Sequence, residues 1–459
     1  MKNFFFHVRN MTLIVAAAAF LGLLLLMVAY SLPNEKIYNN VKASLHIYEI
    51  EHDHYIWGLD KFPTYVDNFT NIVMLMEAIY PVKNGVLDSA LVNRMWSLEE
   101  GNSPAHSLIN GINSNREADL NKDKKYGRYW HGYLIFLKPL LYKTTVGSIR
   151  LLNSYIQLFL IAIAAVLLYK KLGMFYVFAF ILTVAAINPV TTALCFQNST
   201  VFYVLLFAVI ALLLKNEFIK ENARYIYFFL IVGICTSYFD FLTYPFVSLG
   251  VPLCLFVVLN KEKFFIVPIK EVFKKLFGCL FAWCFGYAGM WASKWILATT
   301  LTDYNALADT FYNAIESKLS AVEVIAISPD ANASTWDYIK FLFSPQHNLP
   351  QGYAITQEIT AAEVFYKNIH ALFDTPFAII FALFILFMIF RMIKNKFKPH
   401  MNLNILIIFA FIAALPFVWY FIVIKHSEIH FFFVHRELAI SVFAIACFFI
   451  ELGLKKTFS

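Results

Sequence analysis

The sequence has little charge, few cysteines and none of the common nucleotide- or metal-binding motifs. Only 15% of its 459 residues are charged, whereas soluble globular chains carry about 25%. The six cysteines all lie in or beside hydrophobic runs, with no CxxC pair and no metal-ligand spacing. A Walker A motif, a dinucleotide fingerprint and an HExxH motif are all absent. These absences argue against a disulfide framework, a soluble enzyme and a nucleotide-driven pump.

Hydrophobic residues dominate the chain instead. They make up 60% of it, including 49 Phe, and the mean hydropathy is +0.64. The sequence therefore predicts an integral membrane protein. The net charge of +7 does not indicate a nucleic-acid partner, because the basic residues gather in short loops between hydrophobic runs, as membrane topology requires.

The hydrophobic runs predict an all-α, polytopic fold. A hydrocarbon core about 30 Å thick requires roughly 20 apolar residues per helix, and about ten runs approach that length. They cover approximately residues 12–30, 148–169, 173–190, 199–214, 225–241, 243–259, 276–298, 372–391, 403–424 and 436–453. The first run is expected to stay as an anchor, because VAYS at 28–31 is a poor signal-peptidase site.

Lysine and arginine set the predicted orientation. If the chain changes sides at each span, six groups of basic residues beside the spans all fall on one face, which the positive-inside rule assigns to the cytoplasm. They lie at residues 2–9, 170–171, 215–224, 261–275, 391–398 and 455–456. Both termini are then cytoplasmic. The chain is expected to divide into an N-terminal anchor, a first outer loop, helices 2–7, a second outer loop and helices 8–10, at residues 1–30, 31–147, 148–298, 299–371 and 372–459.

The first outer loop contains three short apolar segments. Residues 70–80 and 87–98 carry apolar side chains at helical spacing and are expected to form amphipathic helices that lie flat in the membrane interface. Residues 133–142 are too short to span and contain Pro139, which is expected to break the segment. The loop is therefore expected to be folded against the membrane surface.

Just before the chain re-enters the membrane, residues 126–133 read YGRYWHGY. Stacking surfaces, a fixed positive charge and a titratable group suit a site for a polar, anionic substrate. Arg128, Trp130 and His131 are therefore candidate substrate-binding residues. The alternative is an aromatic belt, because Trp and Tyr are enriched at membrane interfaces.

Two acids of the first outer loop are candidate catalytic residues. Asp67 precedes the apolar segment at 70–80, and Asp60 lies slightly earlier. Either carboxylate is expected near the outer membrane surface, where it can act as general base toward an acceptor hydroxyl. The alternative for Asp67 is an N-cap of the following helix. No metal site is predicted, although EHDH at 51–54 offers ligands for a divalent metal, with a solvated loop as the alternative.

Four ionisable residues lie at the outer ends of later spans. Asp240 ends the fifth span, where it faces either a cavity or water at a turn. Lys294, flanked by two Trp, is a candidate phosphate contact, with snorkelling to the headgroups as the alternative. His435 and Arg436 open the last span. Arg436 can hold a phosphate in a bidentate fork, or it can pair with Glu437 or another acid of an outer loop.

This layout resembles the polytopic glycosyltransferases of superfamily C (GT-C). The shared features are a short cytoplasmic N-terminus, one helix, a large outer loop with interfacial helices and an acid, and many further helices. The resemblance implies transfer of a sugar from a polyprenyl-phosphate carrier to an acceptor glycan or lipid on the outer face of the membrane. Asp67 or Asp60 would then be the base, and Arg128, Lys294 and Arg436 would stabilise the departing phosphate.

Two other functions stay open. A surface-polysaccharide polymerase or ligase binds its glycan through Arg and His, but the second outer loop has no Arg and two His. A lipid-linked glycan transporter or flippase predicts charges near the membrane midplane, whereas here they gather at the span ends. The expected partners are a polyprenyl-phosphate-linked sugar, its acceptor and membrane lipids. The expected location is a bacterial plasma membrane, with the active site on the non-cytoplasmic face.

Overall fold

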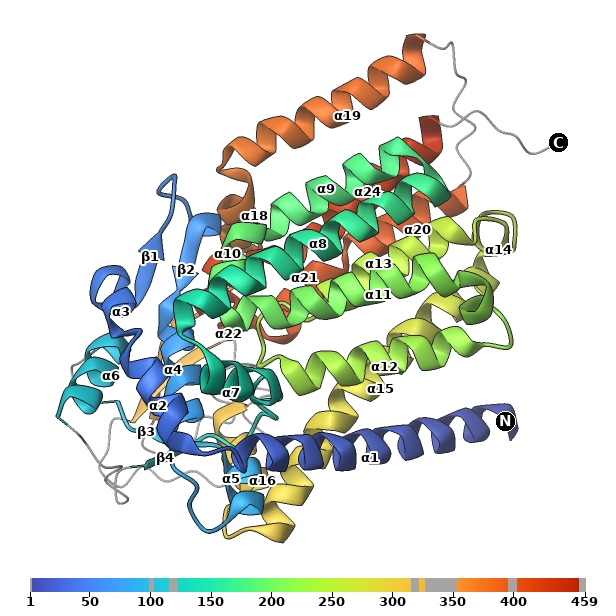
Figure 1. Cartoon of the computed structure of the whole chain (residues 1–459). Coiled ribbons are helices and arrows are strands. Elements are labelled where there is room, and N and C mark those ends of the chain that lie inside the picture. Colours follow the sequence, from blue (N-terminus) through green and yellow to red (C-terminus); the bar gives the residue numbers. More distant parts are fainter. Residues whose placement is uncertain are drawn as a thin grey trace.

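The structure, a computed structural model, describes residues 2–98, 103–114, 123–314, 322–326, 353–394 and 403–453. Over these ranges the chain is almost entirely helical, and its β-structure consists of three two-stranded antiparallel sheets. Figure 1 shows a bundle of long helices with a layer of short helices and strands packed on one end. The predicted class, a helical membrane protein with several spans, is confirmed.

Seven described helices are long and apolar enough to cross a membrane. They are α1 (Lys2–Tyr30), α8 (Val146–Leu172), α11 (Phe196–Lys220), α15 (Ile269–Leu301), α19 (Pro376–Lys394), the pair α20 and α21 (Leu403–Ala413 and Leu415–Ile422), and the run α23, η3 and α24 (Phe431–Val434, His435–Leu438 and Ala439–Gly453). The other three predicted spans fall on shorter apolar helices, α9 (Met174–Ile187), α12 (Arg224–Phe239) and α13 (Val247–Leu259). Every predicted span thus coincides with an apolar helix, while the count of ten crossings stays a prediction.

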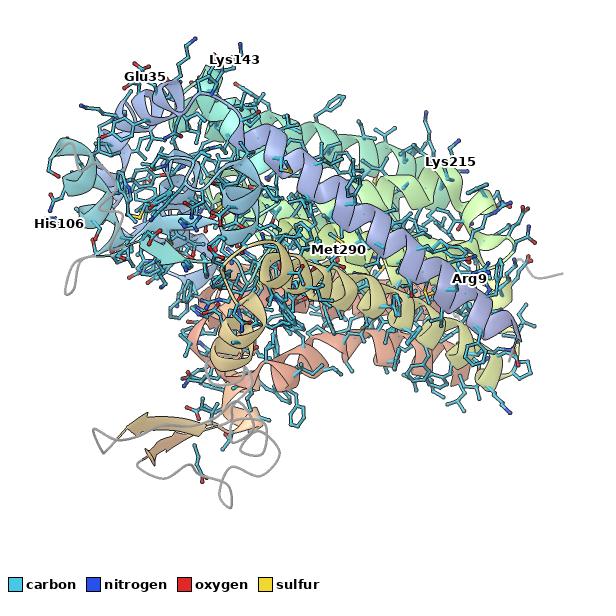
Figure 2. The ribbon with its side chains drawn as sticks, turned by 90° about the horizontal axis from the view of Figure 1, so that it is seen from below. Arg9, Glu35, His106, Lys143, Lys215 and Met290 are labelled. Atoms are coloured by element: carbon cyan, nitrogen blue, oxygen red, sulfur yellow. The ribbon has the colours of Figure 1, made fainter. Side chains whose placement is uncertain are left out.

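One end of the bundle holds the helix ends and short loops with the basic groups at residues 9, 170–171, 215–224 and 261–275. The start of α1 and the end of α24 lie at the same end, together with the short helix α14 (Glu262–Phe265) (Figure 1). Figure 2 shows Arg9 and Lys215 at that end, away from Glu35, His106 and Lys143. We call it the lysine-rich end. This arrangement agrees with the predicted alternation of sides, and the assignment of that end to the cytoplasm stays a prediction.

The first outer loop builds most of the layer at the opposite end, which we call the outer layer. It contains α2 (Asn34–Lys42), α3 (Leu45–Glu51), η1 (Phe62–Thr64), α4 (Asn68–Ile79), α5 (Val86–Val92), α6 (Pro104–Asn113), α7 (Leu134–Lys143) and the strands β1 to β4 (His54–Ile56, Tyr65–Asp67, Arg94–Trp96 and Asp123–Lys125). Strand β1 pairs with β2, and β3 with β4. Segments later in the chain form the remaining short elements, namely α10 (Pro189–Leu194), α16 (Ala306–Ala314), β5 (Val322–Ala326), β6 (Tyr353–Glu358), α18 (Ala361–Phe373) and α22 (Ile424–Ile429).

The three short apolar segments of this loop differ from their predicted form. The segment predicted at 70–80 is α4, but all its residues except Phe69 and Thr70 are buried, so it is a core helix and not an amphipathic helix in the interface. The segment predicted at 87–98 is helical only as far as Val92, because a left-handed Asn93 ends α5, and Arg94–Trp96 form β3. Helix α7 continues through Pro139, which lies just after the first turn, where the missing N–H costs a single helical hydrogen bond.

Two glycines set the distance between α12 and α15. A Cβ atom on Gly233 would lie 2.1 Å from the carbonyl oxygen of Trp283, and one on Gly286 would lie 2.3 Å from that of Leu230. Small residues let helix backbones approach closely in membranes, where packing contacts take over from the hydrophobic effect as the force that holds helices together. The backbones of α12 and α15 therefore pack directly against each other at these two positions.

Candidate functional site

Asp67 lies where β2 meets α4, with only 3% of its surface exposed. Its Oδ1 accepts a hydrogen bond from the Thr70 amide at 3.1 Å, and its Oδ2 accepts one from the Thr70 hydroxyl at 2.7 Å. The side-chain amide of Gln197, in the first turn of α11, donates to the same Oδ2. The N-cap alternative is therefore realised, and in addition the acid is held against the helix bundle.

Arg436 is fully buried in η3, at the outer end of the last span. Its Nε donates to the carbonyl oxygen of Ile187 at 2.9 Å, and its Nη1 donates to those of Phe432 and Phe433 at 3.3 Å. Its Nη2 finds no hydrogen-bond partner among the described residues. The guanidinium lies within electrostatic range of Asp67, so a free cationic donor is buried near the acid.

Two further residues join the acid to the cation. Asn198 is fully buried, and within the described ranges neither its side-chain nitrogen nor its side-chain oxygen has a partner. Its carbonyl oxygen accepts a hydrogen bond from the Tyr244 hydroxyl, and Tyr244 lies within electrostatic range of Arg436. Buried polar atoms almost always find partners, so these free groups favour a binding role. We call Asp67, Gln197, Asn198, Tyr244 and Arg436 the polar cluster.

Asp240 shapes the turn that brings Tyr244 into the polar cluster. It is buried, and its carboxylate accepts hydrogen bonds from the amides of Leu242 and Thr243 at 3.0 and 3.1 Å. The Thr243 hydroxyl donates to it as well, at 2.5 Å. Asp240 is therefore a turn residue, which was one of the two predicted alternatives. That alternative expected the turn to face water, whereas Asp240 is buried.

The residues on either side of Arg436 are also buried. The Nδ1 atom of His435 lies 3.0 Å from the carbonyl oxygen of Phe431, and its Nε2 has no partner in the described part of the chain. Glu437, the alternative partner of Arg436, instead accepts a hydrogen bond from the Phe246 amide at 2.9 Å. The guanidinium therefore keeps its free donor.

An apolar groove of about 380 Å³ runs along α11, the helix whose first turn also carries two residues of the polar cluster. Its walls come from α4, α7, α8, α11 and α12, and one stripe of α11 at helical spacing lines it, namely Phe196, Ser199, Thr200, Tyr203, Val204 and Phe207. Gln197 and Asn198 of the polar cluster lie in the same turn as the first residues of this stripe. Phe136 and Phe207, at the edges of the groove, are 60% and 57% exposed. The groove therefore opens on the apolar surface that a bilayer would cover.

Hydrogen bonds hold the groove wall in place between α8 and α11. The side-chain amide of Asn153 donates to the Ser199 hydroxyl at 2.7 Å, and the Tyr203 hydroxyl donates to Asn153 Oδ1 at 2.5 Å. Hydrogen bonds between spanning helices restrict their relative movement. The polar atoms of the lining are thereby paired, and the surface left to a ligand is apolar.

The segment 126–133 lies under the outer layer and reaches the groove through Tyr133. His131 is 1% exposed, and its Nε2 lies 2.9 Å from the Tyr126 carbonyl oxygen. Its Nδ1 lies 3.0 Å from Glu77 Oε2. The Tyr133 hydroxyl also lies 3.0 Å from this Nδ1, so neighbours in the outer layer contact both ring nitrogens of His131. Burial, with the nearby Glu77, raises the pKa of Tyr133 well above its usual value, and its hydroxyl donates to Glu77 Oε2 at 2.5 Å.

Three other predicted substrate contacts, Arg128, Trp130 and Lys294, have partners outside the polar cluster. The guanidinium of Arg128 lies 3.7 Å from Asp309 Oδ2. The indole of Trp130 is fully buried and donates to the carbonyl oxygen of Met290 at 2.7 Å. The structure therefore divides the predicted residues into two groups, one around Arg436 and one around the outer end of α15.

Lys294 fastens the outer layer to α15. Its Nζ is fully buried and donates to the Ala90 carbonyl oxygen at 2.9 Å and to Asn93 Oδ1 at 2.7 Å. The same ammonium lies 5.3 Å from the centroid of the Trp130 ring, a cation–π distance. Lys294 does not snorkel to the headgroups, because the outer layer covers the end of the span, and the predicted phosphate contact stays a prediction.

Asp60 and the segment 51–54 are not members of the polar cluster, although His54 pairs with Asp67 across strands β1 and β2. Asp60 is exposed in a turn and accepts a hydrogen bond from the Tyr65 hydroxyl at 3.1 Å. Within 51–54, Glu51 forms an ion pair with Arg150 at 2.9 Å. Among the described residues, no group of three or more His, Cys, Asp or Glu side chains is placed to hold a metal ion.

Sequence reasoning missed Gln197, Asn198 and Glu77. The first two belong to FQNST at 196–200, a polar run at the mouth of an apolar span. Polar residues within spans usually face a bundle interior or a cavity, so this run was a usable signal. Glu77 was visible as the single acid of an apolar segment, but its partner Tyr133 lies 56 positions away.

No family model matches this chain, and neither a curated protein nor a solved structure matches it at a significant level. The polar cluster and the groove are therefore the basis on which a function can be proposed.

Proposed function

We propose that this protein is an integral membrane glycosyltransferase of the GT-C type, which moves a sugar from a polyprenyl-phosphate carrier to an acceptor glycan or lipid. The observation that carries this proposal is the junction of the groove and the polar cluster on one turn of α11. Phe196 and Ser199 line the groove, while Gln197 and Asn198 belong to the polar cluster. A ligand that fits both has a long apolar chain and a polar, anionic head.

The groove suits the prenyl chain of such a carrier. Its lining is almost wholly apolar, and it opens where Phe136 and Phe207 are exposed toward lipid. A prenyl chain carries no hydrogen-bonding group, so it leaves nothing unsatisfied when it lies among Phe, Leu and Ile side chains. The carrier can enter sideways from the bilayer, without passing through water.

Arg436 suits the phosphate of the carrier. Its Nη2 is buried, cationic and without a partner in the described structure. Arginine binds phosphate through charge-assisted hydrogen bonds. When the bond between the anomeric carbon and the phosphate oxygen breaks, the phosphate gains a negative charge, and a fixed guanidinium favours that transition state over the bound substrate.

Asp67 suits the role of general base. Its two oxygens accept three hydrogen bonds, from Thr70 twice and from Gln197 once, and a carboxylate offers about four acceptor positions. In the proposed step, the acceptor oxygen forms a bond to the anomeric carbon as the bond to the phosphate oxygen breaks. The acceptor proton passes to Asp67, and polyprenyl phosphate leaves with the bonding electrons.

The proposed sidedness rests on charge. The polar cluster lies at the end of the bundle opposite the lysine-rich end (Figure 1). The positive-inside rule assigns lysine-rich loops to the cytoplasm, so the reaction takes place on the non-cytoplasmic face. The proposed membrane is the plasma membrane of a bacterium.

Turnover in proteoliposomes tests this proposal. The full chain is reconstituted with a panel of radiolabelled polyprenyl-phosphate hexoses, and loss of label from the carrier to lipid acceptors or to water is followed. Asp67→Asn is expected to lower the rate by about 10²–10⁴-fold, the contribution of general base catalysis. Because Asn caps helices as well as Asp does, α4 keeps its start.

Asp60→Asn is the matched control for this variant. It removes the same charge from the same loop, at an exposed position outside the polar cluster, and is expected to keep full activity. Turnover that survives Asp67→Asn contradicts the assigned base. Movement of intact, labelled carrier across the bilayer without cleavage of the sugar would assign the protein to transport instead.

A further inference from the structure

A second pocket lies at the lysine-rich end of the bundle. It measures about 490 Å³ and lies between the ends of α11, α12, α13, α14 and α15. Lys220, which lines it, ends the same helix whose first turn belongs to the polar cluster. At 1.5 Å per residue, a helix of this length separates the two sites by on the order of 35 Å. This pocket is therefore independent of the proposed active site.

The charges around this pocket are predominantly positive. Three lysines line it, Lys220, Lys263 and Lys275, against a single acid, Glu262. Lys220 is neutralised by an ion pair with Glu217. The other two ammonium groups lie within range of mutual repulsion, and like charges held together are destabilising until an anion joins them.

Within the described part of the chain, neither of these two lysines is joined to a carboxylate across the pocket. The Nζ atom of Lys275 donates to the carbonyl oxygen of Lys263 at 2.9 Å and lies 5.5 Å from the centroid of the Phe264 ring. A carbonyl and a ring face hold the ammonium in place, and Glu271, which does not line the pocket, acts on it only at electrostatic range. These contacts therefore position Lys275 without an ion pair in the pocket.

The base of the pocket is aromatic and rigid. The ring centroids of Tyr225 and Phe256 lie 5.7 Å apart, and those of Phe256 and Phe264 lie 5.8 Å apart. Phe256 and Phe264 are almost fully buried. A ligand in this pocket therefore meets two ammonium groups and a wall of aromatic carbon, and a small hydrated anion would use only the ammonium groups.

Exposed apolar side chains continue from the pocket along the bundle. Ile266 is 68% exposed and Phe277 is 54% exposed, and each lies within two residues of a lining residue, Val267 and Lys275 respectively. Side chains of this kind at the surface of a spanning bundle contact acyl chains. The pocket thus joins a basic recess to lipid-facing surface, as expected of a recess at the headgroup level of a leaflet.

We propose that this pocket binds the phosphate headgroup of an anionic phospholipid in the leaflet at the lysine-rich end. Lys263 and Lys275 hold the phosphate, the aromatic base packs against the glycerol backbone, and the acyl chains follow Ile266 and Phe277. Basic recesses between spanning helices on the cytoplasmic side have the chemistry that recognises such headgroups. The bound lipid would hold α14 against the ends of α13 and α15.

Lipid binding to the purified full chain tests this proposal. The detergent-solubilised protein is titrated with dioleoylphosphatidylglycerol, dioleoylphosphatidylcholine or glycerol 3-phosphate, and binding is read from the shift in melting temperature and by native mass spectrometry. The anionic lipid is expected to bind and raise the melting temperature, while the zwitterionic lipid and the soluble phosphate do not. The double variant Lys263→Gln/Lys275→Gln is expected to weaken binding about thirtyfold, because each lysine contributes about 1 kcal/mol.

The control is Lys270→Gln/Lys274→Gln, which removes the same charge from the same region at exposed positions that do not line the pocket. This control is expected to bind like the wild type. Equal weakening in both double variants would mean that general surface charge attracts the lipid, and would overturn the pocket. Equal binding of phosphatidylcholine, or tight binding of glycerol 3-phosphate alone, would overturn the anionic lipid. If the double variant fails to fold, the exposed Lys263→Gln alone carries the same expectation at about fivefold.

Discussion

The side-chain amide of Gln197 donates a hydrogen bond to the carboxylate of Asp67, 130 positions earlier in the chain. The bond joins the first turn of α11 to the N-cap of α4. It fastens the outer layer to the bundle at the point where the apolar groove begins. The position of the proposed base therefore depends on a contact between a loop and a membrane span.

A double-mutant cycle on this pair measures that dependence. Asp67→Ala removes the cap and the acceptor, and is expected to destabilise the protein by about 0.5–2 kcal/mol through the cap alone. Gln197→Ala removes a hydrogen bond to a charged group, worth about 1.5–3 kcal/mol. The double variant is expected to be less destabilised than the sum of the two, because the shared bond is lost once. Strict additivity of the unfolding free energies would mean that the two side chains do not interact.

Filling the groove is expected to act on the carrier and not on the chemistry. Thr200→Trp places a large ring among the lining residues. The KM for the carrier is expected to rise by about tenfold or more while kcat changes little, because the lost contact stabilises the bound substrate and the transition state equally. Leu158→Trp adds a ring to a lipid-exposed position on α8 outside the groove, and is expected to leave KM unchanged. A similar KM in both variants would remove the groove from the proposed function.

Gly132 is expected to tolerate no side chain. A Cβ atom there would lie 2.4 Å from the Tyr238 ring and 2.5 Å from its carbonyl oxygen, which already accepts the Gly132 amide at 2.9 Å. Gly132→Ala should therefore lower the unfolding free energy by about 1–3 kcal/mol, the usual range for overpacking. Gly147 lies in α8, and a Cβ atom there would meet only Ile47, at 3.7 Å. Gly147→Ala should therefore not lower the unfolding free energy, because alanine favours a helix more than glycine does. Thermal unfolding in detergent compares the two.

Lys294 is expected to matter for stability rather than for binding an anion. Lys294→Met leaves Asn93 Oδ1 and the Ala90 carbonyl oxygen without their buried donor, at a cost of about 1–3 kcal/mol for each unsatisfied group. Lys143→Met, at an exposed position, is the control and should change the melting temperature little. An unchanged melting temperature in both variants, with a raised KM for the carrier in Lys294→Met, would restore the phosphate role predicted from the sequence.

Lys138 gives a pH dependence with a defined sign. It lies in α7, and its burial lowers its pKa to about 8. Between that value and the usual lysine value near 10.5 the unfolded chain binds more protons than the folded one, so stability should rise with pH over this window and stay level below it. Melting temperatures at pH 7–10 for the wild type and for Lys138→Met check this, because the variant should lose the part of the rise that Lys138 contributes. An identical slope in both proteins would contradict it.

The spans could be predicted because an apolar run of the right length has few alternatives. Every predicted run falls on an apolar helix. The form of the outer layer could not be predicted in the same way. Helix α4 looked amphipathic around Glu77, but α2, α6 and β3 pack on it from several sides. The acid then pairs with Tyr133 instead of facing water, a contact that local periodicity does not encode.

The candidate site was visible in parts. Asp67 could be named from its place before a helix, and Arg436 as a cation at a span end where the positive-inside rule disfavours one. Their nearness could not be read from the chain, because it depends on how α4, α11 and η3 meet. Lys294 had the same sequence signal as Arg436, yet the outer layer covers it and supplies its partners. Both side chains are fully buried, but Arg436 Nη2 has no partner among the described residues, so the partners supplied by distant segments distinguish the two.

Photocrosslinking of the carrier tests most directly whether the groove and the polar cluster act as one site. A polyprenyl-phosphate hexose with a diazirine in its first isoprene unit is bound to the protein and irradiated, and the attachment sites are mapped by mass spectrometry. We expect label on the α11 stripe from Phe196 to Val204, lost when Thr200→Trp fills the groove and weakened by Arg436→Gln. The account would be contradicted if the label were spread evenly over lipid-facing positions such as Leu158 and if neither Thr200→Trp nor Arg436→Gln changed it.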